Sequence, residues 1–125
     1  IKNAIIDTTV VSGHGSTSGE TNFTSTDKLY LLSTAEVWAQ GSSNTVSTDT
    51  ARDVTRQLDY YKNLSVTTSN KSGAIKKNGT SASYWWLRAA TSSSTYNFLS
   101  VYNNGGWAND PASISRGVAP AFRLG

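Results

Sequence analysis

The sequence predicts an α+β domain in which short strands and two helices surround one core and carry long loops. Residues 84–88 and 118–124 are rich in aromatic and apolar side chains, which favours strands. Residues 33–41 and 48–63 carry helix signals. Ser, Thr, Asn and Gly crowd much of the rest, which is typical of turns and loops. A chain of 125 residues has room for a single domain with a modest core.

The composition narrows the functional classes. Only 15% of residues are charged, well below the roughly 25% of an average soluble domain, so hydroxyl and amide groups must dominate the surface. The formal charge is +3, and the basic residues are scattered except for Lys71, Lys76 and Lys77. This grouping favours a solvated loop over a nucleic-acid patch. The absence of cysteine excludes disulfides, thiolate metal sites and thiol nucleophiles.

The first 25 residues predict little regular structure. Residues 1–11 suggest the end of a helix followed by a short extended piece. Residues 12–25 are rich in Gly, Ser and Thr, which indicates a surface loop. His14 lies between two glycines in this loop and has no acidic or histidine neighbour at a ligand spacing. We therefore interpret it as a loop histidine and expect neither a metal nor a cofactor.

The next segments predict a strand and two helices. Residues 27–32 form an apolar run suited to a short buried strand. Ser33 and Glu36 have the spacing of a capping box, so a helix should begin there and end before Gly41. This spacing favours a capping role for Glu36 over a catalytic one. A second helix is expected over residues 48–63, where apolar residues recur at intervals of three and four.

The remaining segments predict turns and strands. Residues 65–83 are polar, and an Asn-Gly pair at 78–79 suggests a short hairpin. Residues 84–88 should form a strand whose three adjacent aromatics alternate between its two faces. Further strands are expected at 98–101 and 118–124, with a long turn-rich loop at 102–111 between them. This loop presents aromatic and amide side chains, the chemistry of antibody paratopes.

Three sequence blocks carry a family resemblance. They are residues 27–37 (DKLYLLSTAEV), 85–88 (WWLR) and 116–124 (RGVAPAFRL), in that order across about a hundred residues. The chain resembles bacterial and phage domains of the DUF6273 type, which show D-K-x-F-L-L-S-x-x-E-V, W-W-L-R-S and G-V-R-P-A-F-x-L. It departs from that pattern at Ala119, where Arg is usual, and at residues 89–90, where Ser-Pro is common. These departures concern local loop packing more than the fold.

The resemblance implies a C-type lectin-like fold, in a superfamily that also holds formylglycine-generating enzymes and the variable proteins of diversity-generating retroelements. Residues 1–125 are then one such domain and the C-terminal part of the full fold, joined to an upstream part of the same polypeptide or to a carrier protein. Variable proteins of this kind diversify a region near the C-terminus, and residues 92–115 are built largely of the residue types that adenine-directed change produces. An ordinary turn region rich in Asn and Ser explains the same composition equally well.

The first functional hypothesis is a non-catalytic binding module that acts in adhesion or host recognition. Aromatic residues of the 92–115 region would anchor a ligand, and its amide and hydroxyl side chains would make adaptable hydrogen bonds. The partner would be a protein or glycan receptor on another cell surface, and the implied location is extracellular, on a bacterial cell surface or a phage virion. The candidate ligand-binding residues are Ser92, Ser93, Ser94, Tyr96, Asn97, Tyr102, Asn103, Asn104, Trp107, Asn109, Asp110 and Ser113.

Three other hypotheses compete with this one. Catalysis is disfavoured because the sequence shows no Ser/His/acid set and lacks the cysteine pair of the formylglycine-generating relatives. Calcium-dependent sugar binding is disfavoured too: residues 107–110 are similar to a Trp-Asn-Asp segment, but an Ala intervenes and other acidic ligands are missing. A carbohydrate-binding domain of fixed specificity, or an assembly role with oligomer contacts through the Trp-rich segment, stays open. No run approaches 18 apolar residues, so direct membrane insertion is not expected.

Overall fold

The computed structural model describes residues 1–8, 10–11, 23–39, 57–91 and 96–125. Three small and mostly antiparallel sheets make up most of the regular structure in these segments. Helix is limited there to two short α-helices and one 3-10 turn. The predicted α+β class, a C-type lectin-like fold with two helices and long loops, is therefore wrong. Residues whose polar composition indicated loops instead pair as strands, and the described helices are barely more than one turn long.

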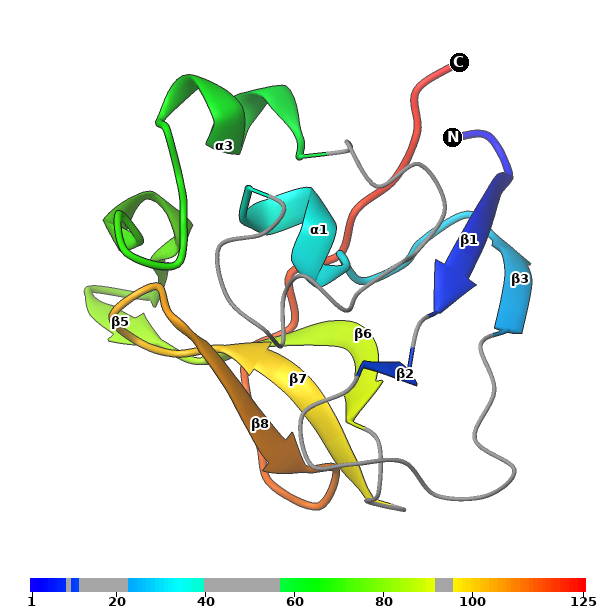
Figure 1. The fold of residues 1–125 in the computed structure, drawn as a ribbon. Coiled ribbons are helices and arrows are strands. Elements are labelled where there is room, and N and C mark those ends of the chain that lie inside the picture. The colour runs from blue at the N-terminus through cyan, green and yellow to red at the C-terminus, as the bar shows by residue number, and fades with distance from the viewer. Residues whose placement is uncertain (9, 12–22, 40–56, 92–95) are drawn as a thin grey trace.

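The largest sheet has the strand order β2-β6-β7-β8 (Figure 1). It comprises β2 (Val10–Val11), β6 (Trp85–Thr91), β7 (Asn97–Val101) and β8 (Trp107–Pro111). Strand β2 pairs with β6 in parallel, and the other two pairings are antiparallel. The register of β6 on β7 shifts between Trp86 and Ala90, so the pairing of the two strands is irregular there. Side chains on β6 alternate strictly between buried and half-buried positions, as a sheet with one core face requires.

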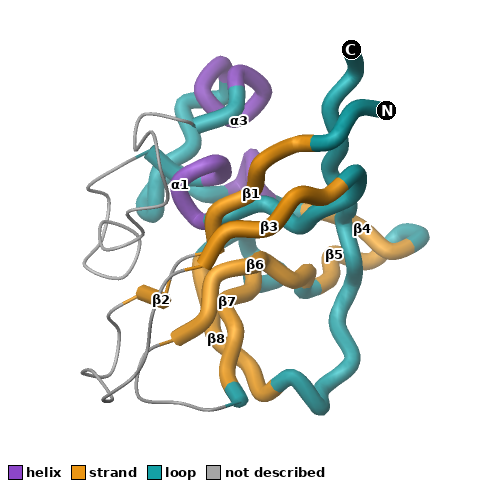
Figure 2. Tube along the Cα trace, turned by 90° about the vertical axis from the view of Figure 1, so that its right-hand side faces the viewer, coloured by secondary structure: helices purple, strands orange, loops and turns teal. Residues whose placement is uncertain are grey.

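Two small antiparallel sheets flank the main one. Strands β1 (Ala4–Thr8) and β3 (Phe23–Asp27) pair along their full length, with Ala4 opposite Asp27. Strands β4 (Lys76–Asn78) and β5 (Ser81–Ser83) form a hairpin. Gly79 turns this hairpin at φ +65°, a conformation that glycine adopts without a Cβ penalty. In Figure 2 the two α-helices lie above β6 and to its left, and the β4–β5 hairpin lies to its right.

The first helix, α1 (Thr34–Val37), begins where the sequence predicts. The Ser33 amide donates to Glu36 Oε2 at 2.8 Å, which is the Glu36 half of the expected capping box. Arg88 Nη1 also donates to this carboxylate oxygen, at 2.6 Å, so the helix is pinned to strand β6 by a nearly buried ion pair. Glu36 is thus structural, in line with the capping prediction.

The second helix, α3 (Asp59–Asn63), and the 3-10 turn η1 (Ser72–Ala74) complete the described helical structure. The predicted second helix is confirmed only at its C-terminal end, because residues 48–56 lie outside the described segments. Tyr61 of α3 is buried, whereas its neighbour Tyr60 is exposed. The two rings meet edge to face at 5.0 Å.

One hydrophobic core lies between the main sheet and the helices. Two of its members, Trp38 and Trp85, satisfy their indole N–H groups with backbone carbonyls: Trp38 donates to Gly105 and Trp85 to Ala74, each at 3.1 Å. A buried indole N–H without a partner is costly, so these bonds fix the depth of both rings. The buried core residues are Leu32, Val37, Trp38, Tyr61, Val66, Ala74, Trp85, Leu87, Ala89, Leu99 and Val101.

The C-terminal segment after β8 returns along the molecule to the N-terminus (Figures 1 and 2). Single bridges attach it in turn to Trp85, Tyr30 and Lys2 through residues 117, 121 and 123. The strand predicted for residues 118–124 is therefore wrong. Its alternate apolar side chains Val118, Phe122 and Leu124 are exposed rather than packed in a sheet.

Four further predictions are corrected at the N-terminal half and in the 102–111 region. Residues 4–8 form strand β1 rather than a helix end, and residues 23–25 belong to β3 rather than to a loop. The run 27–32 is not a buried strand, because Leu29 is exposed and only Leu32 is buried. Residues 107–111 pair with β7 as strand β8, so the predicted long loop shrinks to a turn at 102–106. Backbone pairing with β7 outweighs the weak strand preference of the polar side chains in residues 107–111.

Candidate functional site

The structure places the described residues of the predicted ligand-binding region on the β7–β8 hairpin and the loop after it. Ser92, Ser93 and Ser94 lie outside the described segments. Tyr96 precedes β7 and is 61% exposed, and Ser113 lies in the exposed loop after β8. The predicted region is therefore a paired scaffold element with exposed ends, not one continuous loop.

Register separates the predicted residues onto two faces of the hairpin. Asn97, Leu99 and Val101 lie opposite Pro111, Asn109 and Trp107, so these six side chains share the face that contains the buried core residues. Asn97 Nδ2 donates to Asn109 Oδ1 at 3.2 Å on this face. Asp110 pairs with Phe98, and both lie on the other face of the hairpin together with Ser100. A single ligand surface cannot use all the predicted residues equally.

A connected set of side chains occupies this opposite face, and we call it the Tyr84 cluster: Tyr84, Ser100, Tyr102, Asp110 and Arg116. Arg116 forms a two-pronged ion pair with Asp110, with N···O distances of 3.1 and 3.2 Å. Ser100, which is fully buried, donates its hydroxyl to Asp110 at 2.8 Å. The geometry is that of a charge-assisted fork, which fixes both partners.

The aromatic half of the Tyr84 cluster extends this network. The guanidinium of Arg116 lies 4.0 Å from the centroid of the Tyr84 ring, and the Tyr102 ring meets that ring edge to face at 4.5 Å. A hydrogen bond with Tyr102 raises the pKa of Tyr84 above its ordinary value. The Arg116 hydrogen bonds lower the pKa of Asp110, with a further contribution from Ser100. Asp110 is therefore held ionised, as the partner of Arg116.

The turn between β7 and β8 is tied to the core. The Tyr102 amide donates to the Gly106 carbonyl at 2.7 Å, and the Gly105 amide donates to the Tyr102 carbonyl at 2.9 Å. Asn104 accepts a hydrogen bond from the Gly106 amide through its side chain, at 3.0 Å. Gly105 adopts φ +86°, and its carbonyl receives the Trp38 indole N–H. Asn104 thus holds the turn together, whereas Asn103 is exposed on it.

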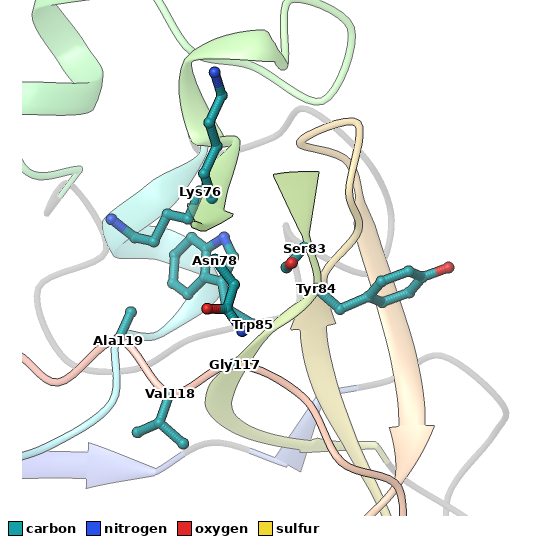
Figure 3. Close-up of a pocket in the computed structure, with 9 residues that line it drawn as sticks. Lys76, Asn78, Ser83, Tyr84, Trp85, Gly117, Val118 and Ala119 are labelled. Atoms are coloured by element: carbon teal, nitrogen blue, oxygen red, sulfur yellow. The ribbon is translucent and has the colours of Figure 1, made fainter. Parts of the chain in front are cut away.

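Two adjoining hollows open beside the Tyr84 cluster, between the β4–β5 hairpin and residues 115–119. Figure 3 shows the residues that line the first of them. Their volumes are about 270 and 390 Å³, and both are lined by Asn78, Ser83, Tyr84 and Gly117. Lys76 and Lys77 line the first hollow, and Arg116 lines the second. We call these joined hollows the hairpin groove. Figure 3 shows the Tyr84 ring pointing away from Lys76 and Asn78.

Sequence patterns alone do not reveal most of this site. They place Tyr84 and Arg116 only in strand-like motifs, and Lys76 and Lys77 only in a solvated loop. Gly117 shows why these distant segments meet: its backbone bonds to Tyr84 and Trp86, and an added Cβ would lie 2.9 Å from the Tyr84 carbonyl oxygen. Only a residue without a side chain permits this approach. The R-G pair at 116–117 is a usable signal for a close backbone contact.

Two kinds of feature are missing from the described segments. They contain no group of three His, Cys, Asp or Glu side chains arranged to hold a metal ion. They also contain no helix with the length and apolar character needed to cross a bilayer.

No curated protein and no solved structure matched the chain. The family model described as a domain of unknown function, DUF6273, matches residues 1–125, which is the full sequence. This agrees with the resemblance carried by the blocks at 27–37, 85–88 and 116–124. The chain therefore belongs to the DUF6273 family.

Proposed function

We propose that this domain is a non-catalytic ligand-binding module for adhesion or host recognition, displayed on a bacterial cell surface or a phage virion. The ligand would be a protein or glycan receptor on another cell surface. One observation carries the proposal: exposed aromatic rings are mounted on a hairpin whose turn is bonded to the core. Tyr96 is 61% exposed, and Tyr102 and Trp107 are 38% and 37% exposed.

Physical reasons support a contact role for these rings. Tyr and Trp provide large contact areas at a low cost in side-chain entropy, so they dominate binding hot spots. The Trp38–Gly105 hydrogen bond and the turn hydrogen bonds around Asn104 reduce the backbone entropy that binding would otherwise cost. A pre-ordered turn with exposed rings is well suited to present a contact surface.

Paired alanine substitutions test this proposal. Tyr96→Ala and Trp107→Ala should each weaken binding to whole cells or to glycan and protein arrays by about tenfold, the effect of a moderate hot spot. Tyr60→Ala is the matched control, because Tyr60 is as exposed as Tyr96 but lies on α3. Equal binding by all three variants would reject the hairpin as the contact surface. Thermal midpoints measured in parallel exclude unfolding as the cause.

The finer relationship, to the variable proteins of diversity-generating retroelements, is also part of the proposal. It is supported by the residue types of the 92–115 region and by the three family blocks. Amplicon sequencing of the 3′ end of the gene in its source population tests it. Substitutions at adenine positions of codons 92–115, with invariant flanks, are expected. Uniform variation or no variation would leave a domain with one fixed specificity.

A specific observation favours a second candidate, an assembly domain. Apolar side chains of the C-terminal segment and of the N-terminal end around β1 are exposed, and these are Ile1, Ile5, Val118, Phe122 and Leu124. Exposed apolar residues of this number are typical of surfaces that contact protein. Size-exclusion chromatography with light scattering distinguishes the candidates, since assembly requires a concentration-dependent oligomer and ligand binding does not.

A further inference from the structure

We propose that the hairpin groove binds an acidic sugar residue, carboxylated or sulfated, of a polysaccharide ligand. This inference rests on the proposed ligand-binding function and names the class of ligand. It concerns residues that lie outside the 92–115 region, apart from Ser115. The hairpin groove lies between the β4–β5 hairpin and residues 115–119, next to the Tyr84 cluster.

The size of the hairpin groove suits a small polar group. The two hollows, of about 270 and 390 Å³, adjoin each other and share four lining residues. Pockets for small ligands typically measure about 300–1,000 Å³. The hairpin groove therefore has space for one or two sugar rings.

The charged residues around the hairpin groove indicate that its ligand is negatively charged. Lys76, Lys77 and Arg116 line the groove, and no Asp or Glu lines either hollow in the described part of the chain. The nearest carboxylate in the network, Asp110, is paired with Arg116, which balances one of the three positive charges. The two lysines leave a positive potential at the first hollow, and a hollow lined by positive charges attracts negatively charged ligands.

The remaining groups favour a sugar over other anions. Asn78, Ser83 and Ser115 add amide and hydroxyl groups that suit a polyhydroxylated ring. The Lys76 ammonium lies 5.0 Å from the centroid of the buried Trp85 ring, and this cation–π contact holds it at the groove. A nucleic acid would need an open aromatic face for base stacking. The Tyr84 ring does not offer such a face, because the Arg116 guanidinium lies over it and the Tyr102 ring meets it edge to face.

The test measures binding of defined oligosaccharides to the full chain by titration calorimetry at about 150 mM salt, an ionic strength that screens long-range attraction. The probes are a galacturonate oligomer, a sulfated chondroitin oligomer, a neutral galactose oligomer of equal length, and polyglutamate. Lys76→Gln/Lys77→Gln removes two charges from the groove. Lys28→Gln/Lys62→Gln removes two charges from exposed lysines that do not line it, and is the matched control.

We expect an acidic oligosaccharide to bind, the groove variant to weaken that binding by about tenfold or more, and the control to change it less than about twofold, because hydrogen bonds to charged groups are strong. Because the chondroitin oligomer carries uronate carboxylates as well as sulfates, binding of this probe alone would show that sulfate is required, whereas binding of the galacturonate oligomer would show that a carboxylate suffices. Circular dichroism and thermal melting confirm that both variants fold.

Several results would overturn the inference. Equal weakening by both double variants would indicate non-specific attraction to a basic protein. Preferential binding of polyglutamate, or no binding of any acidic probe at millimolar concentration, would also reject it. Binding of the neutral oligomer that is lost in Trp107→Ala but kept in the groove variant would reject the acidic sugar and leave the proposed function standing. Binding of an acidic oligosaccharide that is lost in the groove variant but kept in Trp107→Ala would reject the hairpin surface and retain the groove.

Discussion

The substitution Gly105→Ala tests whether the β7–β8 turn is held rigidly against the core. Gly105 is buried, its backbone has φ +86°, and its carbonyl accepts the Trp38 indole N–H. A Cβ added to this glycine would lie 1.9 Å from the Lys71 carbonyl oxygen and 2.8 Å from its carbon. No rotamer change relieves this overlap, because the obstructing atoms belong to the backbone.

The expected cost has three parts. A left-handed backbone conformation costs a residue with a Cβ about 1–2 kcal/mol. Forced displacement in a packed region costs about 1–3 kcal/mol. Moving the turn by more than an ångström would also break the Trp38–Gly105 hydrogen bond and leave a buried indole N–H unpaired, at about 1–3 kcal/mol. The free energy of unfolding should therefore fall by about 3–6 kcal/mol, allowing for partial relaxation.

Gly79→Ala is the matched control. Gly79 also has a positive φ, of +65°, but apart from its chain neighbours no atom of the described segments lies within 4 Å of the position that a Cβ would take in this β4–β5 turn. Its substitution should cost only about 1–2 kcal/mol, for the backbone conformation alone. Urea unfolding followed by Trp fluorescence gives both values with a common slope. If the two variants differ by less than about 0.5 kcal/mol, which is the scatter expected for mild surface changes, the close approach of Gly105 to Lys71 does not exist in solution.

Three further outcomes are expected. Burial raises the pKa of Tyr61 to about 12, so the unfolded state loses this proton first and stability should fall by about 2–3 kcal/mol between pH 10 and 12 relative to Tyr61→Phe. Glu36→Gln should destabilise the fold by about 3 kcal/mol in urea, because it removes the negative charge from a nearly buried ion pair with Arg88. The pKa of Asp110 is lowered in the fold, so its stabilisation is complete above about pH 4 and disappears as the pH falls through the lowered value. Acid unfolding curves of Asp110→Asn should lack that contribution, and at neutral pH the variant should lose about 1–2 kcal/mol.

Local signals predicted local structure well. The Ser33–Glu36 spacing indicated the start of α1, and the Asn-Gly pair indicated the β4–β5 turn, because both depend on hydrogen bonds and dihedral angles within a few residues. The alternation of buried and half-buried residues on β6 followed from its aromatic run. The start of α1 and the β4–β5 turn needed no information from elsewhere in the chain.

Elements that depend on distant partners were predicted poorly. Residues 107–111 form a strand because β7 pairs with them, although Asn, Asp and Pro are unfavourable in strands. Residues 118–124 look like a strand but find only single bridges, so their apolar side chains stay exposed. Strand formation is decided by the pairing partner, and a single sequence does not identify that partner.

The candidate site shows the same division. The exposed aromatics at Tyr96, Tyr102 and Trp107 were predicted from composition, since aromatic side chains among small polar residues are typical of contact loops. The hairpin groove was not predicted, because Gly117 must bring residues 115–119 against Tyr84 to form it. Residues 76 and 116 are forty positions apart in the sequence, and no periodicity relates them.

The geometry also limits which positions a diversified domain could vary. Asn104 bonds the Gly106 amide, and Asp110 bonds both buried Ser100 and Arg116, so replacing either residue removes hydrogen bonds that hold the scaffold. The exposed positions Tyr96, Asn103 and Ser113 support no side-chain hydrogen bond of the turn or of the Tyr84 cluster within the described segments. If residues 92–115 vary in a population, variation should therefore be broad at 96, 103 and 113 and narrow at 104 and 110. Codon variation of equal breadth at all five positions would mean that the Asp110 network and the Asn104 turn are dispensable for folding.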